Sequence, residues 1–223
     1  MVSVEFEELG TIDYKKAWDY QEELFQRSLE LKANNKKAHN YLLFCEHPHV
    51  YTLGKSGDKR NLLLNEDLLK HKKATFYKIN RGGDITYHGP GQIVVYPIID
   101  LEQFNINIKD YICKIEEAII STLSEFNIIA ERLEGATGIW LDTNNTKTRK
   151  ICAIGVRASR YITMHGFAFN VNTNLEYFTY INPCGYIDKG VTSMKKELVK
   201  EQNMEEVKKV LLKKIIEEFN MKI

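Results

Sequence analysis

The stretch RGGDITYHGPGQIVVYP, residues 81–97, contains four glycines, an arginine and a histidine within its first eleven positions, and it then becomes abruptly apolar. Glycine permits positive φ angles and carries no Cβ that would obstruct a neighbouring group. Two interpretations follow from this composition. Residues 81–91 are either an elaborate turn between strands or a loop whose backbone lies very close to a bound molecule that is not protein.

The polar side chains of this loop favour binding. Arg81 carries a rigid fork of five hydrogen-bond donors, and Thr86 and His88 add further polar groups. The loop is no Walker motif, because no Gly-Lys-Ser/Thr follows, and it lacks the GxGxxG spacing of dinucleotide folds. Its backbone amides remain able to hold a carbonyl oxygen or an oxyanion.

The segments around the loop predict a mixture of helices and strands. The apolar run 92–101 predicts a central strand, because strands buried on both faces are apolar throughout. Further strands are predicted at 40–47, 74–80 and 161–172, a hairpin at 138–142 and 150–158, loops at 54–60 and 182–188, and helices at 13–32, 108–126 and 204–219. Asp13 and Asn107 are the predicted N-caps of the first two helices. This order predicts an α/β fold of the α+β type, with mostly antiparallel or mixed sheets in a single domain, residues 1–223.

Composition excludes several classes of protein. The chain has 31 Lys and Arg against 30 Asp and Glu, a net charge of +1, so no basic excess indicates nucleic-acid binding. Its first residues lack the basic start and apolar run of a secretory signal, and no apolar run reaches the length of a membrane span. We therefore expect a soluble cytoplasmic protein without nucleic-acid or membrane partners.

The four cysteines do not suggest a disulfide framework, because the chain is long and has no CxxC pair. Cys45, Cys113 and Cys152 are predicted to be buried, inert thiols. Cys184 differs, because the sequence Asn-Pro-Cys-Gly predicts a tight, exposed turn in which a thiol can react. A reactive thiol needs a nearby cation or base to lower its pKa.

Lys150 is the candidate partner for such a thiol. It opens the run KICAIGV, so its aliphatic stem is expected to enter a buried strand, where desolvation would favour the neutral amine. The alternative is an ordinary surface lysine at the start of a strand, in the company of Lys147 and Arg149.

The histidines give weaker signals. Cys45, His47 and His49 alternate along a predicted strand and superficially suggest zinc, but Pro48 interrupts the strand and no fourth ligand is evident. His165 is predicted to be a structural residue within its strand. We expect neither a metal nor a cofactor.

Four motifs, taken together and in order, resemble those of the lipoyl(octanoyl) transferases. They are RGGDITYHGPGQIVVY, KICAIGV, HGFAFNVN and INPCG, and EHPHVYTLG at 46–54 is similar to the segment that this family carries before its glycine loop. The resemblance covers residues 5–220. It implies the fold of the biotin and lipoate protein ligases, with mixed sheets flanked by helices.

The resemblance also implies a reaction and a site. Octanoyl would pass from octanoyl-acyl carrier protein to a lysine of lipoyl domains, which belong to 2-oxoacid dehydrogenases and the glycine cleavage H protein. Cys184 would be the acyl-thioester nucleophile and Lys150 its activating partner. The implied substrate-binding residues are Arg81, Gly82, Gly83, Asp84, Ile85, Thr86, Tyr87, His88, Ala153, Ile154, Gly155, Gly166, Phe167 and Ala168.

The chemistry of the residues agrees with this reaction, although it does not select it uniquely. A thioester donor and an amine acceptor favour a two-step route through a cysteine thioester, with backbone donors for each oxyanion. The alternative is an ATP-dependent lipoate or octanoate ligase, which needs no reactive cysteine. Two further alternatives are a cysteine hydrolase that pairs Cys184 with His88 or His165, and a non-catalytic module that binds acyl carrier protein.

Overall fold

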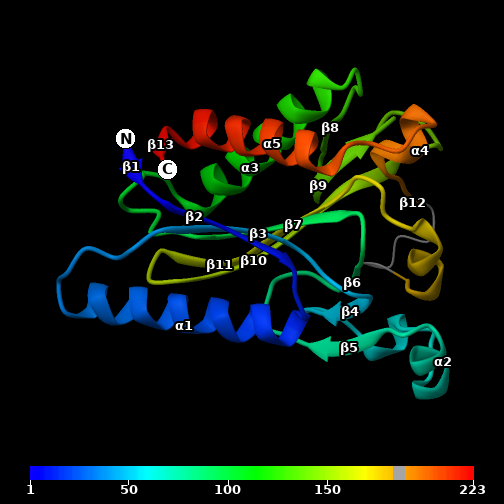
Figure 1. The fold of residues 1–223 in the computed structure, drawn as a ribbon, viewed down its shortest axis with the longest axis horizontal. Coiled ribbons are helices and arrows are strands. Elements are labelled where there is room, and N and C mark those ends of the chain that lie inside the picture. Colours follow the sequence, from blue (N-terminus) through cyan, green and yellow to red (C-terminus); the bar gives the residue numbers. More distant parts are fainter. Residues whose placement is uncertain (183–188) are drawn as a thin grey trace.

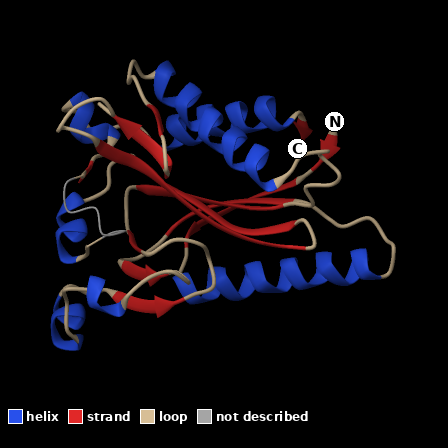
Figure 2. Cartoon of the chain, turned by 180° about the vertical axis from the view of Figure 1, so that it is seen from behind, coloured by secondary structure: helices blue, strands red, loops and turns tan. Residues whose placement is uncertain are grey.

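A large mixed sheet forms the middle layer of the molecule. The structure is a computed structural model that describes residues 1–182 and 189–223, so Cys184 and its predicted turn lie outside the described residues. Helix α1 (Tyr14–Ala33) covers one face of the sheet, and α3 (Ile108–Glu125) and α5 (Met204–Phe219) cover the other (Figures 1 and 2).

The strand order of the large sheet is β2-β3-β7-β11-β10-β9-β8, and β12 pairs with β10 off this path. β2 runs parallel to β3 and β12 parallel to β10, whereas the other pairs are antiparallel, which confirms the prediction of a mostly antiparallel or mixed sheet. The strands are β2 (Glu5–Thr11), β3 (Tyr41–Glu46), β7 (Gln92–Ile98), β8 (Glu131–Leu133), β9 (Ala136–Leu141), β10 (Arg149–Ser159), β11 (Ile162–Asn170) and β12 (Gly190–Val191).

A three-stranded sheet, in the order β5-β4-β6, lies beside one end of α1 (Figure 1). It contains β4 (Val50–Leu53), β5 (Thr75–Lys78) and β6 (Ile85–His88). The remaining elements are short: β1 (Val2–Ser3), α2 (Glu66–His71), α4 (Met194–Leu198), β13 (Met221–Lys222), and the 3-10 turns Lys59–Asn61 and Leu175–Tyr180. β1 pairs with β13, which brings the two ends of the chain together.

The central strands are mostly apolar because helices cover both faces of the sheet. In β7, Ile93 and Val95 enter the core under α3 and α5, whereas Val94 and Tyr96 enter the core under α1. This alternation follows from the two-residue period of a strand. The predicted central position of residues 92–101 is confirmed.

Both predicted N-caps are present. The Asp13 side chain accepts hydrogen bonds from the backbone N–H groups of Lys15 and Lys16, and Asn107 forms a capping box with Asp110. Such caps satisfy amide groups that have no partner within the helix. The predicted hairpin at 138–142 and 150–158 is also present, as β9 and β10.

Two sequence predictions are wrong. Residues 81–91 are not entirely a loop, because Ile85–His88 forms β6 and pairs with β4. Cys113 is exposed and not buried. It lies two positions from both Tyr111 and Ile115 on α3, and two helical positions are about 200° apart, so it faces away from the core that they enter. In the described part of the chain, no helix is long and apolar enough to cross a membrane.

Candidate active site

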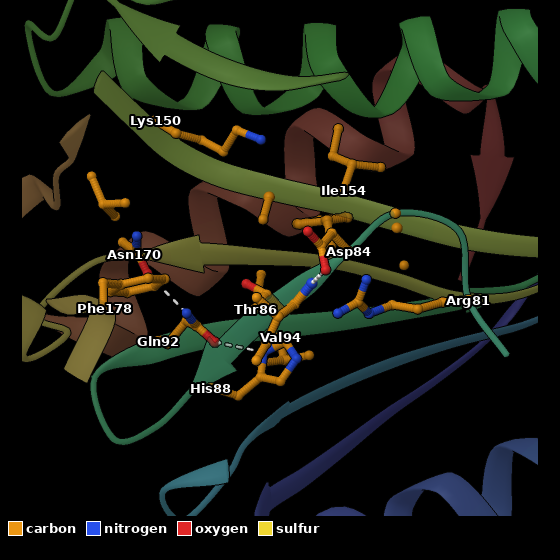
Figure 3. Close-up of a pocket in the computed structure, with 18 of the residues that line it drawn as sticks. Arg81, Asp84, Thr86, His88, Gln92, Val94, Lys150, Ile154, Asn170 and Phe178 are labelled. Atoms are coloured by element: carbon orange, nitrogen blue, oxygen red, sulfur yellow. Dashed lines mark hydrogen bonds between the residues drawn. The ribbon is translucent and has the colours of Figure 1, made fainter. Parts of the chain in front are cut away.

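A cavity of about 110 Å³ lies between strands β10 and β11 and the segment that leads into β6 (Figure 3). Most of the predicted substrate-binding residues line it, namely Arg81, Gly83, Asp84, Ile85, Thr86, His88, Ala153, Ile154, Gly155, Gly166, Phe167 and Ala168. Lys150 lines it as well. The fold therefore brings together three segments that lie far apart in the sequence.

Gly82 and Tyr87 are the two predicted residues outside this lining set. Tyr87 belongs instead to the aromatic core of the small sheet, where its ring stacks on Tyr177 with 4.9 Å between ring centroids. Its hydroxyl lies 2.7 Å from Nδ1 of His49. Thr86 and His88, on the opposite face of β6 from Tyr87, line the cavity, whereas Ile85 shares the core of Tyr87 and reaches the cavity as well.

The two adjacent glycines allow the loop to lie against β10. The Gly82 N–H donates to the Val156 carbonyl at 2.9 Å, and a Cβ on Gly82 would lie 3.3 Å from the same oxygen. Gly83 has a φ of +83°, which disfavours any residue with a side chain. The close neighbour that requires Gly82 is therefore the backbone of β10.

Arg81 is buried and holds the loop against β4. Its Nη2 donates to the carbonyl oxygen of Thr52 at 2.7 Å and to the Thr52 hydroxyl at 3.0 Å. Its Nη1 donates to the Gly82 carbonyl at 3.0 Å. The Arg81 guanidinium was expected to bind a ligand, but three of its hydrogen bonds go to protein oxygens and hold the loop in shape.

A chain of buried amides crosses the floor of the cavity. Gln92 Nε2 donates to the Tyr87 carbonyl at 3.2 Å and to Asn170 Oδ1 at 2.8 Å (Figure 3). Asn170 Nδ2 donates to the Thr192 carbonyl at 3.0 Å. Because Gln92 uses its amide nitrogen in this way, its oxygen is left as the acceptor for His88 Nδ1, 2.9 Å away.

These contacts fix the tautomer of His88. Nδ1 carries the proton because it faces an acceptor, so Nε2 is the acceptor for the Thr52 hydroxyl at 3.4 Å. The Thr52 oxygen in turn accepts from Arg81. Burial lowers the pKa of His88 to about 3, and the positive charges of neighbouring groups act in the same direction. His88 is therefore neutral, and both of its ring nitrogens are hydrogen-bonded.

His165 also lines the cavity, but only one of its ring nitrogens is hydrogen-bonded. Its Nε2 lies 2.7 Å from Asn80 Oδ1 and donates to it, and its backbone N–H donates to Gln21 Oε1 at 3.2 Å. Its Nδ1 is buried without a hydrogen-bond partner. Burial lowers its pKa to about 3, with Arg81 and Arg157 contributing. The contact with Asn80 agrees with the structural role predicted for His165, whereas its place in the cavity lining was not predicted.

Lys150 emerges from β10 beside the cavity (Figure 3). It is half-buried, with Nζ donating to the Thr137 carbonyl at 3.2 Å and lying 4.4 Å from the centroid of the Trp140 ring. Its strand pairs with β12, so that Val191 lies next to Lys150. Residues 183–188, which include Cys184, precede β12, and the distance from Lys150 to that thiol lies outside the described part.

Cys152 does not have the surroundings of a reactive thiol. It is buried in the core under α3, and burial raises its pKa well above the ordinary value. Cys45 is equally buried, and its pKa is raised for the same reason. Desolvation penalises a thiolate, so both thiols are expected to be unreactive.

Of the alternating set Cys45, His47 and His49, only the first two are in contact, with Cys45 Sγ 3.5 Å from His47 Nε2. His47 Nδ1 donates to the Ile12 carbonyl at 2.7 Å, and its Nε2 accepts from the Tyr96 hydroxyl at 2.7 Å. The His49 ring instead stacks on Tyr177 of the 3-10 turn Leu175–Tyr180, with 4.1 Å between ring centroids. Among residues 1–182 and 189–223, no group of three or more His, Cys, Asp or Glu side chains is arranged to hold a metal ion.

Several lining residues were not identified from the sequence. They are Tyr14, Gln92, Val94, Tyr96, Trp140, Asn170, Phe178, Lys189, Gly190 and Val191. Gln92 and Asn170 did carry a signal, because each is a polar residue at the end of an apolar strand run, and a buried amide must find partners. Apart from Lys189 and Gly190, the others are aromatic or apolar residues typical of any core.

Comparison with known proteins shows the family to which this chain belongs. The model of the lipoyl protein ligase A/B catalytic domain matches residues 13–216. The chain is 57% identical over 227 residues to an octanoyltransferase of Christiangramia forsetii, covering 99% of this chain and 97% of the relative. It is 57% identical over 225 residues to an octanoyltransferase of Flavobacterium psychrophilum, covering 98% and 97%.

The solved structures agree with the predicted fold. A bi-partite lipoate protein ligase from Thermoplasma acidophilum superposes with a TM-score of 0.73 at 14% identity, covering 100% of this chain and 86% of that one. At this identity the likeness establishes the fold alone.

Proposed function

We propose a mechanism for this chain, which belongs to the lipoyl protein ligase A/B catalytic domain family and is an acyltransferase that catalyses octanoyl transfer in lipoate biosynthesis. The acceptors are lipoyl-domain proteins. We assign the donor as octanoyl-acyl carrier protein, and the acceptor lysines as those of 2-oxoacid dehydrogenases and the glycine cleavage H protein. Residues 1–223 act as one catalytic domain.

The reaction runs in two acyl transfers. The Cys184 thiolate attacks the thioester carbonyl of the donor, a new carbon–sulfur bond forms, and the thiol of the carrier leaves with a proton. The acceptor amine then attacks the octanoyl-Cys184 thioester, forms the amide, loses a proton and expels the thiolate. Lys150 stabilises the thiolate as an ammonium and gives its proton to the departing carrier thiolate. As a neutral amine it then takes the proton that the acceptor amine loses, which restores the ammonium.

The observation that carries this proposal is the position of Lys150. Its amine lies at an apolar cavity, and its strand is paired with β12, the strand that follows the segment of Cys184. Val94, Ile154 and Phe167 supply apolar walls for the acyl chain. Gly82 and Tyr87 serve this site indirectly, Gly82 through the fit of the loop on β10 and Tyr87 by anchoring β6.

The histidine contacts argue against a cysteine hydrolase. A thiol–imidazole pair needs an imidazole that can accept a proton near neutral pH. His88 and His165 are buried, hydrogen-bonded through the nitrogens described above, and have pKa values of about 3. Neither is a base for Cys184.

The test is the intact mass of the protein after mixing with octanoyl-acyl carrier protein in the absence of ATP. We expect an octanoyl adduct that hydroxylamine removes and that is discharged onto an added lipoyl domain. Cys184→Ser gives no such adduct, Lys150→Met forms it slowly, and Cys152→Ser serves as the matched control that behaves as wild type. Labelling of the lipoyl domain that requires ATP and free octanoate would replace this mechanism with that of a ligase.

A further inference from the structure

One peptide unit beside Lys150 is released from the sheet. The pairing of β8 with β9 jumps from Arg132–Ile139 to Leu133–Ala136, and Thr137 and Gly138 have no register partner on β8. The pairing of β9 with β10 ends at Ile139, after a bulge between Lys150 and Cys152. Such bulges re-aim side chains and free backbone groups for other partners.

The two polar ends of this peptide unit meet two functional side chains. The Gly138 N–H donates to Oε1 of Glu116 at 3.2 Å, and the Thr137 carbonyl accepts from Lys150 Nζ at 3.2 Å. Both groups belong to the same trans peptide, in which N–H and C=O point in opposite directions within one plane. The peptide is therefore a rigid bridge from the carboxylate to the amine.

Glu116 is well placed to act through this bridge. It lies on α3 with only 6% of its surface exposed, and Arg132 Nε donates to its second oxygen at 3.0 Å. A carboxylate that accepts the N–H polarises the peptide and strengthens the carbonyl as an acceptor for an ammonium group. The bridge also needs glycine, because a Cβ on Gly138, at φ +121°, would lie 2.6 Å from the Cys152 carbonyl.

We infer that Glu116 is a positioning residue for Lys150, which it orients through the Thr137–Gly138 peptide without touching the substrate. This inference rests on the role of Lys150 in the proposed function. It assigns a task to a buried carboxylate on α3 that does not line the cavity.

The first test is a double-mutant cycle on the rate of octanoyl-enzyme formation, measured by intact mass. Glu116→Met keeps the side-chain length and removes the acceptor, and we expect about tenfold slower acylation from the loss of one charge-assisted hydrogen bond. In a Lys150→Met background the same substitution has no further effect, because its target is gone. An equal loss in both backgrounds, or none in the wild type, overturns the inference.

The matched control is Glu117→Gln. Glu117 neighbours Glu116 on α3 and also accepts from Arg132, at 2.8 Å, but its side chain is 43% exposed. The described contacts of Glu117 do not include Gly138. We expect it to leave the acylation rate within about twofold of the wild type, as is usual for an exposed ion pair.

A second measurement does not depend on activity. Lys150 is acetylated with a water-soluble succinimidyl ester, and its labelling rate is read by peptide mass spectrometry. Glu116→Met is expected to label Lys150 about fivefold faster, because the Thr137 carbonyl becomes a weaker and less firmly held acceptor for the amine, and Glu117→Gln is not. Unchanged labelling refutes the inference, whereas full activity of Lys150→Met refutes only the proposed function. If thermal melting shows that Glu116→Met does not fold, Glu116→Leu, which also carries no acceptor for the Gly138 N–H, replaces it, and the absence of faster labelling is then the refuting result.

Discussion

Three buried histidines predict a steep loss of stability in mild acid. Burial lowers the pKa of His47 to about 4, and of His88 and His165 to about 3, from an ordinary value of 6.5. Below pH 6.5 the unfolded chain binds protons at these positions and the folded chain does not. The stabilisation from neutral histidines is therefore fully present above pH 6.5 and is lost as the pH falls towards 3 to 4.

The size of the loss follows from the pH difference. At pH 5, about 1.5 units below the ordinary value, each neutral histidine contributes about 2 kcal/mol less than at neutral pH. The three together remove about 6 kcal/mol, which is comparable with the whole stability of a typical domain. Carboxyl groups such as Glu197, whose pKa is lowered, change the stability only below about pH 4.5. The loss of stability between pH 6.5 and pH 5 therefore comes mainly from the histidines.

The assay is urea unfolding followed by tryptophan fluorescence at pH 7.5, 6.0 and 5.0. We expect the free energy of unfolding to fall by about 4 kcal/mol per pH unit near pH 5. His88→Gln should reduce that slope by about a third, and the exposed His71→Gln on α2 should leave it unchanged. A free energy of unfolding that stays constant from pH 7.5 to 5.0 would refute the reasoning.

One substitution and one alkylation reaction test the described contacts. Gln92→Leu leaves the buried His88 Nδ1–H and Asn170 Oδ1 without their partner, so the free energy of unfolding at pH 7.5 should fall by about 3 kcal/mol. A loss below about 0.5 kcal/mol would show that the amide chain is dispensable. Iodoacetamide should alkylate the exposed Cys113 in the native protein far faster than the buried Cys152, whose pKa is raised, as measured by peptide mass spectrometry. Equal rates for the two thiols would contradict that burial.

The long elements were predictable because their signals are local. Asp13 and Asn107 cap helices whose apolar residues recur at helical spacing, and residues 93–98 are an unbroken apolar run within β7. Cys113 was predicted wrongly because its apolar neighbours in sequence were taken as neighbours in space. Its position on α3 faces solvent, and only the angular order of the helix distinguishes the two cases.

The site was predicted less completely, since its supports are not local. β6 has only four residues and lies within a glycine-rich stretch. It pairs with β4, which lies more than thirty residues earlier in the chain. Motif resemblance placed Lys150 and Ile154 at the site, but no motif pointed to Glu116. Its relation to Lys150 exists only because two register shifts expose one peptide unit.

The two supports of the site meet at Thr192. The amide chain from the cavity floor ends on the Thr192 carbonyl, and the Thr192 N–H donates to the Lys150 carbonyl at 2.9 Å. Thr192, which directly follows β12, is therefore held both by the cavity floor, through Asn170, and by the strand of Lys150. Because all these bonds join protein groups, they are present before any substrate arrives. In the mechanism that we propose, the strand of Lys150 is thus already fixed when the nucleophile reacts, which is the preorganisation that acyl transfer through a charged intermediate requires.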